Sequence, residues 1–231
     1  MVFVVAEIGV NWNGDFELLE QMMLKSKESG CNSIKLQAFN EKIVENHPEK
    51  FRLMKTTVDS SNIEKIDSIA KKIGIEWFCT PMYKEAIEFL NPFVSRFKIR
   101  NSDSLDYLKN GKSELVEAVI KTKKIVYASV SDSKIIPDTN TNGIKWLYVV
   151  PKYPTNLEDL DFSQMGKFDG YSNHCPKLVA PLTAAILGAN TIEIHITSDK
   201  TKDFFDNNVS LDYQELTSLL NLIREIEQVK I

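Results

Sequence analysis

The heptapeptide TIEIHIT, residues 191–197, has the composition of a β-strand but carries two ionisable side chains. Isoleucine and threonine favour strands, and residues two apart in a strand point to the same side. One side therefore shows three isoleucines, and the other shows Glu193, His195 and Thr197. If helices and packed side chains cover both sides of this strand, the carboxylate and the imidazole need partners or a function.

Segments with strand and helix character alternate along the whole chain. Eight segments have strand character, at 3–10, 33–39, 75–80, 94–100, 124–130, 144–150, 168–172 and 191–197. Apolar residues at helical spacing follow most of them, at 15–30, 61–74, 83–90, 113–122, 158–166, 176–187 and 211–228. The stretch 131–143 is rich in helix breakers. Regular alternation predicts a parallel sheet, and eight units predict a (β/α)₈ TIM barrel with an eroded helix after strand 5.

Local sequence features support these boundaries. Asp15 is expected to cap the first helix and Gly30 to end it, and Ser61 with Glu64 forms a potential capping box. A doubly wound sheet is the alternative fold, but no glycine-rich phosphate loop follows the first strand. Because no linker rich in proline, glycine or serine interrupts the alternation, residues 1–231 are predicted to form a single catalytic domain.

The composition excludes several classes of partner. The chain has 231 residues, 43% of them apolar, and its net charge of −4 gives no reason to expect nucleic acid or a membrane surface. The sequence shows no signal peptide and no apolar run of membrane-spanning length. Three scattered cysteines fit reduced thiols better than a disulfide framework. We therefore expect a cytoplasmic protein.

Polar residues recur where barrel strands end, although such strands are usually apolar. Active sites of TIM barrels lie at this end. Lys35 and Lys98 on non-adjacent strands suit an anion, although Lys35 could instead form a structural ion network with Glu7 and Glu193. The residues in question are Glu7, Lys35, Gln37, Thr80, Lys98, Ser172, His174, Glu193 and His195.

The chain has only three histidines, and two of them end neighbouring strands. His174 and His195 form half of a plausible site for a divalent transition metal, with nearby carboxylates and open positions for water or substrate. A hydrogen-bonded pair in the core is the alternative. His47, in a polar stretch, is expected at the surface.

A series of motifs spans nearly the whole chain in one order: AEIGVNWNGD (6–15), IKLQAF (34–39), FCTP (78–81), FKIRNSD (97–103), YPT (153–155), GYSNH (170–174), GANTIEIHIT (188–197) and DNNVS (206–210). This series resembles the sialic acid (N-acetylneuraminate) synthase family. The resemblance implies a TIM barrel that condenses phosphoenolpyruvate with an N-acetylated aldose such as N-acetylmannosamine. Phosphate and a nonulosonic acid are the implied products.

The resemblance also implies roles for individual residues. His174 and His195 look like ligands of a divalent metal, Mn²⁺ in the first place, with Mg²⁺ or Co²⁺ as alternatives. Glu7, Asp103 and Lys98 look like the catalytic residues. The implied substrate-binding residues are Lys35, Gln37, Thr80, Asn101, Ser129, Tyr153, Ser172 and Asp206.

Several positions depart from the family pattern. Trp12 replaces a histidine, Arg100 and Asn101 replace Ser-Gly, and Val150 and Pro151 stand where polar donors are usual. The sequence ends at the last helix, without the family's antifreeze-like C-terminal domain, so either a homodimer or a separate capping subunit is conceivable. These departures leave two alternatives open: a catalytically impaired barrel that serves as a binding or scaffold subunit, and a metal-dependent barrel enzyme of other chemistry, such as phosphodiester hydrolysis.

Overall fold

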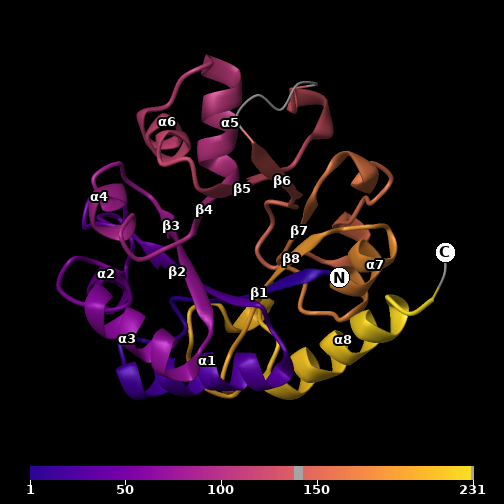
Figure 1. Ribbon diagram of the computed structural model, residues 1–231, viewed down its shortest axis with the longest axis horizontal. Coiled ribbons are helices and arrows are strands. Elements are labelled where there is room, and N and C mark those ends of the chain that lie inside the picture. The colour runs from indigo at the N-terminus through magenta and orange to yellow at the C-terminus, as the bar shows by residue number, and fades with distance from the viewer. Residues whose placement is uncertain (138–142, 230–231) are drawn as a thin grey trace.

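The computed structural model describes residues 1–137 and 143–229 and confirms the (β/α)₈ barrel (Figure 1). Eight parallel strands follow one another around the barrel in chain order, and β8 pairs with β1 to close it. The strands are β1 (Phe3–Gly9), β2 (Ser33–Ala38), β3 (Glu76–Pro81), β4 (Arg96–Ile99), β5 (Ile125–Val130), β6 (Ile144–Tyr148), β7 (Gly170–Asn173) and β8 (Thr191–His195).

The helices lie around the outside of the strands (Figure 1). In the described residues they are α1 (Phe16–Ser29), α2 (Lys50–Met54), α3 (Ile63–Ile73), α4 (Ala86–Leu90), α5 (Asn101–Asn110), α6 (Glu114–Lys121), α7 (Val179–Ile186) and α8 (Tyr213–Ile226). None of them is long and apolar enough to cross a membrane.

The eroded helix after β5 is confirmed for the described residues. Only a 3₁₀ turn, Ser133–Ile135, precedes β6, and residues 138–142 of the expected breaker-rich stretch lie outside the described part of the chain. The expected helix at 158–166 is wrong, because two 3₁₀ turns, Leu157–Asp159 and Met165–Lys167, occupy this connection.

Two helix starts show how side chains set the boundaries. The Asp15 carboxylate accepts hydrogen bonds from the backbone N–H groups of Glu17 and Leu18, as expected of an N-cap. The expected capping box of Ser61 and Glu64 is wrong, because α3 begins one residue later and its N-cap makes no side-chain bond. The Asp59 carboxylate takes up the Ser61 backbone N–H instead.

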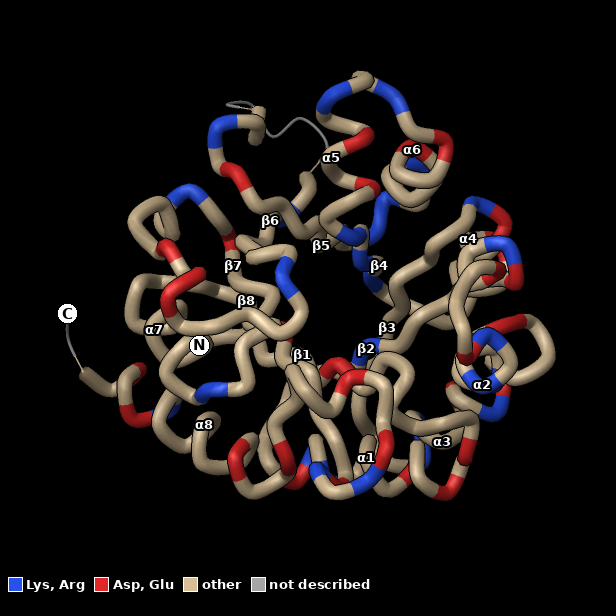
Figure 2. Tube along the Cα trace, turned by 180° about the vertical axis from the view of Figure 1, so that it is seen from behind, with Lys and Arg blue, Asp and Glu red and all other residues tan. Residues whose placement is uncertain are grey.

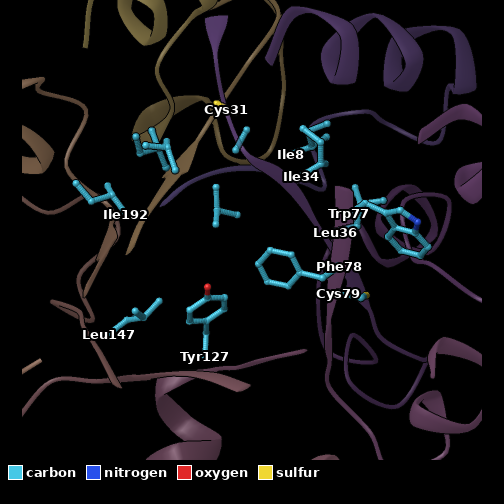
Figure 3. Close-up of a cluster of buried hydrophobic side chains, with 14 of the residues drawn as sticks. Ile8, Cys31, Ile34, Leu36, Trp77, Phe78, Cys79, Tyr127, Leu147 and Ile192 are labelled. Carbon is cyan, nitrogen blue, oxygen red and sulfur yellow. The ribbon is translucent and has the colours of Figure 1, made fainter. Parts of the chain in front are cut away.

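The core has two layers, one inside the barrel and one between the strands and the helices. Figure 3 shows Phe78 and Tyr127 pointing toward one another inside the barrel, while Trp77 points the opposite way. The two interior rings are 5.9 Å apart between centroids. Large apolar side chains therefore fill the barrel interior below the carboxyl ends of the strands. The polar side chains of the strands lie at those carboxyl ends.

Candidate active site

The carboxyl ends of the strands surround a cavity of about 350 Å³. Every sequence-predicted site residue lines this cavity except Asp103 and Asp206. The lining residues are Glu7, Lys35, Gln37, Thr80, Met82, Lys98, Arg100, Asn101, Ser102, Ser129, Val149, Pro151, Tyr153, Ser172, His174, Glu193 and His195.

A buried ion network forms the floor of the cavity. One carboxylate oxygen of Glu193 lies 3.1 Å from Lys35 Nζ and 3.1 Å from Lys98 Nζ. The same oxygen accepts a hydrogen bond of 2.8 Å from the Ser172 hydroxyl. Lys35 also lies 3.3 Å from Glu7, its neighbour in the β1–β2 register. Figure 2 shows basic residues on β2 and β4 at the inner side of the trace.

The network shifts the pKa values of its members in different directions. Burial by itself raises the pKa of Glu193, but the charges of Lys35 and Lys98 outweigh burial and lower it. Burial lowers the pKa of Lys98 to about 8, whereas the attraction of Glu193 and Glu7 overcomes the burial of Lys35 and raises its pKa. Burial raises the pKa of Glu7. The expected ion network therefore exists, and its residues also line the cavity.

Four oxygen atoms around the cavity are buried without a hydrogen-bond partner. They are Glu7 Oε2, Thr80 Oγ1, Asn101 Oδ1 and Ser129 Oγ. Buried polar groups almost always have partners, and leaving one unpaired costs about 1–3 kcal/mol. In the described residues only two other side-chain oxygens, Ser104 Oγ and Tyr213 OH, share this condition. These four oxygens are therefore polar groups of the cavity that no protein atom satisfies, and they remain available to water or to a bound molecule.

The two predicted metal ligands lie side by side at the mouth, with ring centroids 5.5 Å apart. His174 Nδ1 lies 3.2 Å from the Val150 carbonyl oxygen, and His195 Nδ1 lies 3.2 Å from the Asp206 carboxylate. Oxygen acceptors at both Nδ1 atoms place the ring protons there and leave both Nε2 lone pairs for a ligand. Burial and the neighbouring His195 lower the pKa of His174 to about 3, so its imidazole is neutral.

This donor set fits a divalent transition metal. Neutral imidazole nitrogen is a common ligand of such ions, and the acceptors at Nδ1 hold the rings in place. The described residues contain no cluster of three or more histidine, cysteine, aspartate or glutamate side chains arranged for a metal. If a metal binds here, His174 and His195 would supply two of its ligands, one fewer than the three protein ligands of most catalytic zinc sites.

Tyr153 covers the histidine pair. Its ring centroid lies 4.8 Å from that of His174 and 5.6 Å from that of His195, both nearly perpendicular. Its hydroxyl lies 3.4 Å from His195 Nδ1. Burial of the phenol oxygen, followed by the Asp206 charge, raises the pKa of Tyr153 well above its usual range, although the residue as a whole is 46% exposed. Asp206 therefore contacts His195 and Tyr153 from outside the cavity. It lies close to the site but does not line the cavity.

Asp103 lies beside the cavity rather than in its wall, and its role in proton transfer stays a prediction. Its carboxylate oxygens bond Arg100 Nε at 2.7 Å and Nη2 at 3.0 Å, and it does not line the cavity. Met82 was not among the expected residues, although it lies two residues beyond Thr80 and so faces the same side. Trp12, which replaces a family histidine, is buried in the core and donates its indole N–H to the Thr56 carbonyl oxygen.

The β6 side of the cavity is apolar. Val149 and Pro151 line it, and Pro151 has no backbone N–H to donate. Polar side chains flank this apolar stretch on both sides, since Ser129 lies on the adjacent β5 and Ser172 on the adjacent β7.

Comparison with known proteins agrees with the fold and shows the family. The model of the NeuB family matches residues 22–230. N,N'-diacetyllegionaminic acid synthase of Legionella pneumophila is 27% identical over 98% of this chain and 72% of its own length. N-acetylneuraminate-9-phosphate synthase of Mus musculus is 28% identical over 98% of this chain and 70% of its own length.

A solved structure extends the likeness to three dimensions. N-acetylneuraminic acid synthetase from Leptospira borgpetersenii, in complex with citrate, superposes with a TM-score of 0.86 at 26% identity. The superposition covers 98% of this chain and 84% of that chain. With most of its length matched by the family model, and with sugar-acid synthases among its relatives, this chain belongs to the NeuB family.

Proposed function

We propose that the protein is a nonulosonic acid synthase. It condenses phosphoenolpyruvate with an N-acetylated aldose such as N-acetylmannosamine and releases phosphate. The observation that carries this proposal is the cluster of four unpaired, buried oxygens around a cavity floored by two lysines. The named activities of the relatives support the same reaction class.

The hydroxyl and ammonium groups of the cavity suit phosphoenolpyruvate. Its phosphate and carboxylate can accept hydrogen bonds from hydroxyl groups and ammonium groups, and such charge-assisted bonds are strong. Thr80 and Ser129 have hydroxyls without a partner, and Lys98 reaches the cavity from the neighbouring β4. Holding phosphoenolpyruvate in one orientation would turn its C3 carbon toward His174 and His195, where we expect the aldose to bind.

The histidine side suits the carbonyl partner. A divalent metal held by His174 and His195 would supply Lewis-acid polarisation of the aldehyde oxygen. Tyr153 and Asp206 contact the ring of His195, and the Tyr153 ring packs against both imidazoles. A new C–C bond forms between C3 of phosphoenolpyruvate and the aldehyde carbon.

Glu7 is the group best placed for proton transfer. Attack by C3 leaves positive charge at C2, where water adds before phosphate departs. Glu7 Oε2 has no partner, while Oε1 accepts a hydrogen bond of 2.8 Å from Gln37. A carboxylate with one free, buried oxygen can take the proton of the attacking water. Gly9, with φ of +52°, lets the chain pass close to Glu7 and Gln37, since a Cβ there would lie 3.0 Å from both side chains.

The apolar β6 wall favours one alternative, a catalytically impaired barrel that serves as a binding or scaffold subunit. One experiment separates the two. The pure protein is incubated with phosphoenolpyruvate, Mn²⁺ and a panel of N-acetylated aldoses, and phosphate release is followed with and without a chelator. Release that requires an aldose supports synthesis. Absence of release, together with no thermal shift on adding phosphoenolpyruvate, would refute it and favour the scaffold.

A further inference from the structure

Arg100 is a cation at the mouth of the cavity that the ion network does not neutralise. It follows β4 directly, two residues after Lys98, so both side chains face the interior. Its side chain is 33% exposed. Lys35 and Lys98 are both bonded to Glu193, and Lys35 also to Glu7, so the four deep charges sum to zero.

The guanidinium of Arg100 is fixed in direction. Asp103 takes Nε and Nη2 in a two-point ion pair, and Nη1 lies 3.2 Å from the Met82 sulfur. Sulfur is a weak acceptor. A guanidinium has five N–H donors, so the edge formed by Nη1 and Nη2 keeps donors for a second anion. Asp103 is therefore a positioning residue for Arg100.

The surroundings of Arg100 suit a phosphoryl group. Arg100 is the N-cap of α5, a ten-residue helix whose first residues, Asn101 and Ser102, line the cavity. No side chain caps this helix start, and helix starts attract anions. A second, independent observation comes from Ser129 and Thr80, residues that are 2% and 1% exposed, line the same cavity and have hydroxyls without a partner.

We propose that Arg100 binds the phosphoryl group of phosphoenolpyruvate, together with Lys98 and the start of α5. This inference rests on the proposed function and adds a residue to it that departs from the family pattern. Arginine forms planar two-point contacts with phosphate, which lysine cannot reproduce. Asp103 balances the charge of Arg100, so what Arg100 adds to the site is a set of directed N–H donors rather than net charge.

The test compares Arg100→Met and Arg100→Lys with the wild type. Phosphoenolpyruvate affinity is measured by calorimetry, and KM values for phosphoenolpyruvate and aldose are measured in the phosphate-release assay. Loss of a charged hydrogen-bonded contact predicts a roughly 10- to 100-fold weaker phosphoenolpyruvate affinity for Arg100→Met. Arg100→Lys should fall between the two, and the aldose KM should stay unchanged.

The matched control is Arg96→Met. Arg96 begins β4 and forms a two-point pair with Glu76, at 2.7 and 2.8 Å, but does not line the cavity. Its loss should leave phosphoenolpyruvate affinity unchanged. Thermal melting checks that each variant is folded.

Two results would overturn the inference: phosphoenolpyruvate binding by Arg100→Met as tight as by the wild type, or a loss confined to the aldose. A wild type that binds no phosphoenolpyruvate overturns the proposed function itself, so the two failures are distinguishable.

Discussion

Replacing Glu193 with glutamine removes the charge on which the cavity floor depends. One Glu193 oxygen serves Lys35, Lys98 and Ser172, with all three contacts between 2.8 and 3.1 Å. Glutamine keeps the shape but leaves two buried ammonium groups with only Glu7 as counter-charge. Removing one partner of a buried ion pair costs about 3–5 kcal/mol. For a chain of this size, that cost lowers the melting temperature by roughly 6–20 °C.

The assay is calorimetric melting as a function of pH. Because the pKa of Glu193 is lowered on folding, its stabilising contribution is present above the ordinary value of 4.5 and is lost on acidification. The difference between wild type and Glu193→Gln should therefore be large at pH 7 and shrink at low pH. It should also shrink at high pH, because Lys98 can lose its proton there.

Glu76→Gln is the matched control, since Glu76 binds Arg96 in a more exposed ion pair. Such pairs contribute about 0–1 kcal/mol. The reasoning is refuted if Glu193→Gln melts within the range of this control at pH 7. A double variant, Glu193→Gln with Lys98→Met, should melt above Glu193→Gln alone, because it removes the ammonium group that Glu7 does not balance.

Three further predictions concern single residues. His195→Ala should abolish Mn²⁺ binding in calorimetry, and unchanged affinity would contradict the proposed metal site. Lys98 has a pKa of about 8 in the folded protein, below its ordinary value of 10.5. Between these two pH values the unfolded chain binds more protons than the folded protein, so the free energy of unfolding should rise with pH by about 3 kcal/mol. Melting curves of Lys98→Met across that pH range should lack this rise. Ser129→Ala should leave the free protein as stable as the wild type or more so, since its hydroxyl has no partner, while phosphoenolpyruvate affinity falls roughly tenfold; destabilisation without loss of affinity would argue against a ligand-binding hydroxyl.

The fold could be predicted because the strand and helix periods are regular along the chain. The positions of most site residues follow from two rules: side chains alternate in a strand, and barrel active sites lie at the carboxyl end. Ser172 with His174, and Glu193 with His195, were paired in this way, and all four line the cavity. The roles assigned to them remain predictions.

Helix α5 could not be predicted, and the position of Asp103 depends on it. The segment Asn101–Asn110 is mostly polar, and its apolar residues, Leu105, Tyr107 and Leu108, are too few to establish a helical period in the sequence. Without a helix, nothing in the sequence places Asp103 one turn from Arg100. The bond from Lys98 to Glu193 joins β4 to β8 across the barrel, and no local pattern encodes such a distance.

The polar wall of the cavity can take either water or a ligand. Glu7 Oε2, Thr80 Oγ1, Asn101 Oδ1 and Ser129 Oγ have no hydrogen-bond partner within the described protein, and a cavity of about 350 Å³ has room for water. Because water can satisfy these groups in the free protein, a ligand gains affinity there only where its polar atoms reproduce or improve the hydrogen bonds of the water it displaces. A carboxylate oxygen such as Glu7 Oε2 can only accept, whereas the hydroxyls of Thr80 and Ser129 can also donate. The wall therefore discriminates between ligands by how well their donors and acceptors match it, and not by relieving a cost in the free protein.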